Sequence, residues 1–176
     1  MGLILVRHTR PDVPADLCYG RLDVGLRNTF AEEASTVERA LPIVSRVVSS
    51  PLQRCRTLAC FIARRRGLPM DVDDRLVEMD FGTWEGRSWS QLPKAELDAW
   101  SQDFMHARPH GGESVAMLKS RAARALADWS ERQESIAVVT HSGVIKAACS
   151  GTGVEVQHFA VSVAFGGIMP LSNFET

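Results

Sequence analysis

Three short apolar segments constrain the fold of this chain more than any other feature. They are GLILV at residues 2–6, RVVS at 46–49 and IAVVT at 136–140. Short apolar runs without polar alternation are typical of strands buried on both faces, as in a parallel sheet covered by helices. We therefore expect a mostly parallel central sheet.

Helical patterns lie between and after these segments, at residues 30–41, 51–66, 113–132 and 143–150. Strands that alternate with helices predict a single three-layer α/β domain, with helices on both faces of the sheet. A last apolar segment, residues 161–168, is expected to add an edge strand.

Residues 71–112 depart from this alternation. They contain Trp84, Trp89 and Trp100, which are three of the four tryptophans, and a helical stretch near 93–107. We expect an insertion that lies over the sheet and over the active site at its edge, within one domain that comprises residues 1–176.

The composition excludes several classes of protein. A net charge of −1 gives no basic surface for nucleic acid. The chain has no signal-peptide pattern at its N-terminus and no apolar run long enough to cross a membrane. The four cysteines form no CxxC pair; they are Cys18, Cys55, Cys60 and Cys149. A cytoplasmic protein with reduced thiols is therefore expected.

Each of the three expected strands ends at reactive polar residues. The first runs into Arg7 and His8, the second into SSPLQR with Arg54, and the third into THSG with His141. Ligands of open α/β sheets bind beyond the carboxyl ends of the strands. The three strand ends are therefore expected to form one pocket.

The second strand end has the clearest local pattern. Ser50 suits an N-cap, Pro51 the first helical position, and Gln53 the partner position of a capping box. This places Arg54 on the first turn of a helix, where backbone N–H groups already attract anions. By position alone, an anion-binding arginine and an exposed helix arginine are equal alternatives.

A single histidine after a strand is most often structural, but His8 lies beside arginines and is matched by His141. A metal site is the rival use of two histidines. It would require nearby carboxylate or cysteine ligands, and arginines would oppose the cation. Arginine together with histidine favours an anion, most simply phosphate, and no metal or cofactor is expected.

Five motifs occur in the order found in the histidine phosphatase (phosphoglycerate mutase-like) superfamily: LVRHTR, SSPLQRCRTLA, LVEMDFGTWEG, PHGGES and VVTHSG. The chain resembles that family from residue 3 to residue 143. The resemblance implies a phosphoglycerate mutase-like fold and phosphoryl transfer through a phosphohistidine. The implied catalytic set is His8 as the nucleophile, Arg7, Arg54 and an imidazolium of His141 around the phosphoryl oxygens, and Glu78 as the acid that protonates the leaving oxygen and then activates water.

Other residues are weighed against this set. Asp80 and Glu85 are the competing carboxylates and are expected to be loop or surface charges. The chain departs from the family pattern at Thr9, where many members have glycine, and at Arg10, where an acidic residue is frequent. The roles of Arg10 and Arg21 stay open.

The stretch CYGRLDVGL at 18–26 resembles the α-ribazole phosphatase branch of the family. This implies hydrolysis of α-ribazole 5′-phosphate to α-ribazole and phosphate, late in cobalamin assembly. Tyr19, the single tyrosine, is a candidate to stack on the base or the ribose. The expected substrate-binding residues are Thr9, Tyr19, Gly20 and Ser142.

Three alternatives remain. A broad or sugar-phosphate phosphatase of the same family would share every catalytic residue. A non-catalytic phospho-ligand binding module should lack the nucleophile or the acid, yet His8 and Glu78 are both present. A metal hydrolase would lose its activity with EDTA. The expected partner is a small-molecule phosphate ester, with neither nucleic acid nor membrane; the sequence does not indicate an oligomeric state.

Overall fold

A computed structural model describes residues 2–150 and 162–171 of the chain. Their five-stranded sheet has the order β3-β2-β4-β1-β5. The strands are β1 (Gly2–Arg7), β2 (Arg46–Ser49), β3 (Met70–Val72), β4 (Ser135–Thr140) and β5 (Ile168–Leu171). All neighbouring pairs are parallel except β1 and β5, which run antiparallel. The expected mostly parallel α/β sheet is confirmed.

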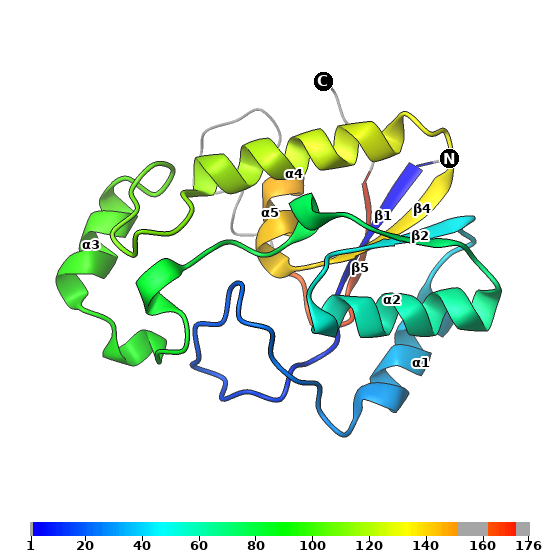
Figure 1. Ribbon diagram of the computed structural model, residues 1–176, viewed down its shortest axis with the longest axis horizontal. Helices are drawn as coiled ribbons and strands as arrows, with labels where there is room; N and C mark the ends of the chain where they lie inside the picture. The colour runs from blue at the N-terminus through cyan, green and yellow to red at the C-terminus, as the bar shows by residue number, and fades with distance from the viewer. Residues whose placement is uncertain (1, 151–161, 172–176) are drawn as a thin grey trace.

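The described residues form five α-helices, four of which cover the sheet. The five are α1 (Phe30–Ala40), α2 (Gln53–Arg66), α3 (Lys94–Gln102), α4 (Val115–Ser130) and α5 (Ser142–Cys149). Figure 1 shows α4 and α5 on one side of the sheet and α1 and α2 on the other. None of the helices in this part of the chain is long and apolar enough to cross a membrane.

Alternating side chains of the strands supply the two halves of the core. Leu3 and Leu5 of β1 pack with α4 and α5, whereas Ile4 and Val6 pack with α1 and α2. Successive residues of a strand point to opposite faces, so a continuous apolar run fills both layers. Because β1 and β4 are buried on both faces, their ends are rigid supports for polar side chains.

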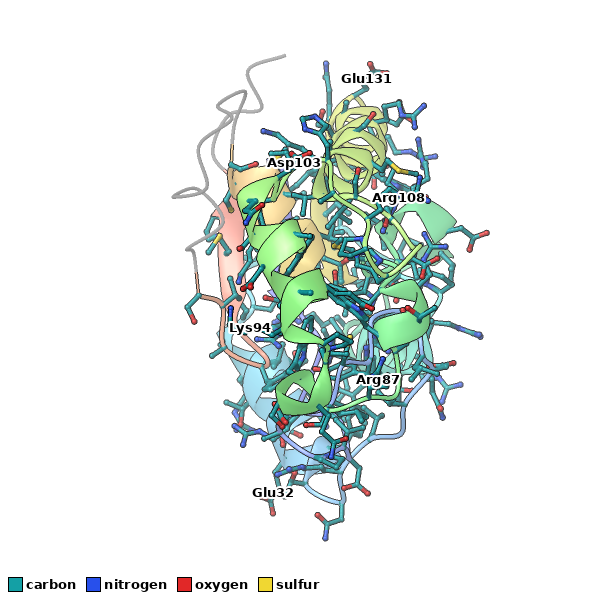
Figure 2. The ribbon with its side chains drawn as sticks, turned by 90° about the vertical axis from the view of Figure 1, so that its left-hand side faces the viewer. Glu32, Arg87, Lys94, Asp103, Arg108 and Glu131 are labelled. Carbon is teal, nitrogen blue, oxygen red and sulfur yellow. The ribbon has the colours of Figure 1, made fainter. Side chains whose placement is uncertain are left out.

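The segment 71–112 begins inside a strand that the sequence pattern did not predict, β3. It continues through three short 3₁₀ turns into α3, which is shorter than the predicted helix near 93–107. Trp84, Trp89 and Trp100 gather there, with the rings of Trp84 and Trp100 5.6 Å apart. Figure 2 looks onto α3, with Lys94 and Asp103 labelled near its two ends, at one end of the molecule.

The edge strand was predicted in the wrong place. It spans Ile168–Leu171, while residues 162–167 form a loop and residue 161 lies outside the described residues. Gly166 has a φ of 71°, a left-handed backbone conformation that is incompatible with a β-strand. Its N–H lies 3.1 Å from the His8 carbonyl oxygen, so the loop folds over the end of β1.

The predicted cap of α2 was also wrong. The helix begins at Gln53, with Leu52 as an N-cap that makes no side-chain hydrogen bond. Asp23, from a distant loop, accepts from the Gln53 N–H at 2.8 Å. The Ser50 hydroxyl lies 2.7 Å from Nε2 of His141 and accepts weakly from the Leu52 N–H at 3.4 Å, ahead of the helix.

Candidate active site

Three parallel strands bring their carboxyl ends together at one edge of the sheet. Arg7 is paired with Thr140 across β1 and β4, and the His8 N–H donates to the Thr140 carbonyl at 3.0 Å. The rings of His8 and His141 lie 5.3 Å apart between centroids. The strand ends that the sequence marked as polar therefore meet in one place.

His8 is buried, with 2% of its surface exposed. Its Nδ1 lies 2.7 Å from the Thr9 carbonyl oxygen, which can only accept, so the proton is on Nδ1 and Nε2 carries the lone pair. Burial, helped by the Arg54 and Arg7 charges, lowers the pKa of His8 to about 3. At neutral pH the residue is therefore an uncharged imidazole with a free Nε2.

The arginines of the site are held by carbonyl groups. Arg54 is fully buried and donates to the carbonyls of Gly20 at 2.6 Å and Leu22 at 2.7 Å. Arg7 donates to the carbonyl of Val163 at 2.5 Å. The Nε of each guanidinium is buried and has no hydrogen-bond partner among the described residues.

No carboxylate neutralises either guanidinium. Among residues 2–150 and 162–171, neither Arg7 nor Arg54 has an Asp or Glu oxygen within 4.0 Å. A buried guanidinium and a half-buried one, both without a carboxylate partner, could together bind an anion. The position of Arg54 thus agrees with the anion-binding alternative, since an exposed helix arginine would not be buried.

His141 precedes α5 and is fully buried, with Nε2 in contact with the Ser50 hydroxyl at 2.7 Å. Burial, and then the charge of Arg54, holds the pKa of His141 well below its ordinary value. The expected imidazolium is therefore a neutral imidazole in this structure. It can supply one N–H donor to an anion but not a full charge.

Glu78 reaches the site from the loop after β3. Its Oε2 accepts from the Gly143 N–H of α5 at 3.0 Å, and its Oε1 accepts from the Met79 N–H at 2.9 Å. Position 143 must be glycine for this contact, since a Cβ there would lie 2.2 Å from Oε1. The carboxylate is thereby fixed beside the first turn of α5.

A third arginine secures the backbone that carries Glu78. Arg121 of α4 donates to the carbonyls of Val77 at 2.6 Å and Glu78 at 3.0 Å. Both oxygens of Glu113 hold this guanidinium, at 2.7 and 2.8 Å. Sequence reasoning assigned no role to either residue, although Glu113 lies in the quoted motif PHGGES.

The four expected substrate contacts have different environments. Thr9 is fully buried, and within residues 2–150 and 162–171 its Oγ1 has no hydrogen-bond partner. The Tyr19 ring lies 5.2 Å from the Arg54 guanidinium carbon. The Gly20 carbonyl is used by Arg54. Ser142 is the first residue of α5 and lines the pocket beside Glu78.

That pocket has a volume of about 500 Å³ and is largely apolar. Phe81, Trp100 and Phe104 provide aromatic walls. Glu78, Ser142 and Lys146 are the polar members of the lining. Tyr19 does not line it.

Phe165 is a further residue that sequence reasoning missed. Its ring centroid lies 3.8 Å from the Arg7 guanidinium carbon and 5.6 Å from the His8 ring. The sequence pattern predicts an edge strand over residues 161–168, and no motif contains Phe165. Arg10 lies further out, 5.5 Å from the same ring, and Arg21 is an exposed side chain near Asp80 and Glu113.

The described residues contain no group of three or more His, Cys, Asp or Glu side chains placed to hold a metal ion.

A family model described as the histidine phosphatase superfamily, branch 1, matches residues 3–162. The chain belongs to the histidine phosphatase superfamily. As a member it is a phosphatase, and its relatives act on small-molecule phosphate esters.

Two curated relatives differ in substrate. The chain is 33% identical over 153 residues to the adenosylcobalamin/alpha-ribazole phosphatase of Escherichia coli K12, covering 82% of this chain and 75% of the relative. It is 31% identical over 164 residues to the glucosyl-3-phosphoglycerate phosphatase of Mycobacterium tuberculosis H37Rv, covering 82% and 72%.

Among solved structures, the alpha-ribazole phosphatase of Shigella flexneri superposes with a TM-score of 0.83 at 29% identity. The match covers 96% of this chain and 88% of that one. The family resemblance and the phosphoglycerate mutase-like fold predicted from the motifs are thus confirmed.

Proposed function

We propose that this phosphatase works through a phosphohistidine on Nε2 of His8, without a metal, and that its substrate is α-ribazole 5′-phosphate. The observation that carries the mechanism is the state of His8: a neutral ring with its proton held on Nδ1, beside the buried guanidinium of Arg54 and the half-buried one of Arg7. A neutral imidazole nitrogen next to an anion site is a nucleophile for phosphorus.

The first step forms the bond from His8 Nε2 to phosphorus and breaks the ester bond. Glu78, in its protonated form, gives its proton to the leaving oxygen. The Thr9 carbonyl keeps its hydrogen bond to Nδ1, which stabilises the positive charge that develops on the ring. Arg7, Arg54 and an N–H of His141 bind the phosphoryl oxygens.

The second step releases phosphate. The Glu78 carboxylate takes a proton from a water molecule, whose oxygen bonds to phosphorus while the bond to His8 breaks. The Gly143 N–H donates to this carboxylate and keeps it beside the reacting group. The same group can therefore serve as the acid in the first step and as the base in the second.

The aromatic pocket supports the substrate assignment. It adjoins Glu78, where the leaving group must lie, and Phe81, Trp100 and Phe104 suit a flat aromatic base. The relatives named for alpha-ribazole point the same way. A role late in cobalamin assembly belongs to this proposal, as does a cytoplasmic location, which the four free cysteines favour.

A sugar-phosphate substrate is the second candidate, because a glucosyl-3-phosphoglycerate phosphatase is 31% identical. Such a leaving group would require many hydrogen-bond partners. The pocket beside Glu78 has few polar side chains, so we rank this substrate below α-ribazole 5′-phosphate.

The test is phosphate release in EDTA from α-ribazole 5′-phosphate, glucosyl-3-phosphoglycerate and p-nitrophenyl phosphate. His8→Ala should abolish turnover, whereas His106→Ala, at an exposed histidine, should not. Rapid quenching should trap a phosphoenzyme that is stable to alkali and labile to acid. Turnover that survives His8→Ala would refute the mechanism, and preference for the glucosyl substrate would refute the substrate assignment.

A further inference from the structure

The loop between β1 and α1 lies between the side chains of Arg54 and Glu85, which form no salt bridge with each other in the described part of the chain. On one side, Arg54 donates to the Gly20 and Leu22 carbonyls at 2.6 and 2.7 Å. On the other side, Glu85 accepts from the N–H groups of Arg21 at 2.8 Å and Leu22 at 2.7 Å. The backbone of three consecutive residues separates the cation from the anion.

One peptide unit joins the two charges directly. The Gly20 carbonyl and the Arg21 N–H belong to the same planar amide group. Its oxygen faces the guanidinium and its hydrogen faces the Glu85 carboxylate. The peptide dipole is therefore aligned by both ends, and each hydrogen bond polarises and strengthens the other.

Glu85 is itself held in place. Its Oε1 also accepts from the Phe81 N–H at 3.0 Å. A Cβ on Gly20 would lie 2.6 Å from Oε1 and 2.2 Å from the Met79 carbonyl oxygen, so only glycine permits this approach. From the sequence, Glu85 is expected to be a loop or surface charge and Gly20 a substrate contact; neither interpretation predicts this arrangement.

We propose that Glu85 is a positioning residue that orients Arg54 through the Gly20–Arg21 peptide unit. A carboxylate in direct contact with Arg54 would compete with phosphate oxygens for the same donors. Acting through a peptide, Glu85 fixes the carbonyl that holds the guanidinium and leaves the Nε of Arg54 without a partner. The inference rests on the proposed role of Arg54 in binding the phosphoryl group.

The test is a double-mutant cycle read out as the inhibition constant of inorganic phosphate. Glu85→Gln keeps the side-chain size but removes the charge and one acceptor oxygen. We expect phosphate to bind about tenfold more weakly, the equivalent of one charge-assisted hydrogen bond of roughly 1.4 kcal/mol. Glu131→Gln is the matched control, because Glu131 is an exposed carboxylate at the end of α4, and it should change binding less than twofold.

The same substitution is then made in Arg54→Ala. If Glu85 acts through Arg54, Glu85→Gln should change phosphate binding less than twofold in that background. An equal loss in both backgrounds, or no loss in wild type, would overturn the inference. If Arg54→Ala alone leaves phosphate binding unchanged, the proposed role of Arg54 fails as well, so the two failures are distinguishable.

A measurement on the unmodified protein keeps the test independent of how the variants fold. Phosphate titration followed by NMR should shift the amide protons of Arg21 and Leu22, because binding at Arg54 changes the polarisation of the peptide between the charges. Unshifted amides at saturating phosphate would overturn the inference.

Discussion

Replacing Gly143 with alanine tests the assignment of Glu78 as the acid. The new Cβ would lie 2.2 Å from Glu78 Oε1 and 3.1 Å from its Cδ. The carboxylate must move by at least about 1.2 Å, the difference between 2.2 Å and an ordinary contact of 3.4 Å. Alanine favours helix over glycine by about 1 kcal/mol, so α5 itself should not be lost.

The size of the effect depends on the leaving group. General acid catalysis is typically worth ~10²–10⁴ in rate, and a displacement of about 1 Å can cost ~10². We expect Gly143→Ala to lower kcat/KM about 10²-fold for α-ribazole 5′-phosphate, whose alkoxide must be protonated. For 2,4-dinitrophenyl phosphate the loss should stay below about threefold, because dinitrophenolate leaves without a proton.

The assay uses kcat/KM because this constant reports only the steps up to formation of the phosphoenzyme. Water activation, the other role proposed for Glu78, belongs to a later step and therefore does not affect kcat/KM. Gly25→Ala is the matched control, because a Cβ at Gly25 would meet no atom within 4 Å. Equal losses for both esters, or no loss for either, would refute the assignment of Glu78 as the acid.

Four further predictions follow from the site. Because the pKa of His8 is lowered to about 3, only the unfolded chain gains its proton between pH 6.5 and that value. The free energy of unfolding should therefore fall with decreasing pH over that window, by up to about 1.4 kcal/mol per pH unit for this group; urea titrations should show that His8→Gln lacks this share. Phe104→Ala should raise KM for α-ribazole 5′-phosphate about tenfold without changing inhibition by inorganic phosphate, as steady-state kinetics would show. Inorganic phosphate at 100 times its Kd should stabilise the protein by about 2.7 kcal/mol, measurable by calorimetry. Alkylation followed by peptide mass spectrometry should label Cys60 before Cys18 and Cys55, because both of these are buried and burial raises the pKa of Cys18 to about 12.

The sequence predicted the fold and the position of the site where the signal is local. Three apolar segments indicated parallel strands, and parallel strands must end at one edge of the sheet. His8 and His141 were therefore placed together before any contact was known, and their rings lie 5.3 Å apart. The motifs added Glu78, whose contact with α5 no periodicity in the sequence could reveal.

The rest depends on partners that are distant in the chain. Ser50 has the residue type of an N-cap, yet Asp23 takes the Gln53 N–H and Ser50 contacts His141 instead. Phe165 lies against Arg7 from a segment 158 positions further along the sequence, measured from residue 7 to residue 165. Local propensity cannot anticipate either contact, because tertiary hydrogen bonds and ring packing override it.

In this site Arg7 and Arg54 are held by carbonyl groups and not by carboxylates, and this choice has an electrostatic reason. A carbonyl oxygen carries only a partial charge, so Arg7 and Arg54 keep most of their positive field while their donors are fixed. The same field, together with burial, keeps His8 neutral and its Nε2 free. A carboxylate on either guanidinium would weaken both effects at once: it would repel the phosphate dianion and favour the protonated, non-nucleophilic form of His8. Taking such charges out of water costs several kcal/mol each, and in the proposed mechanism the phosphoryl group of the substrate is the counter-charge that offsets this cost.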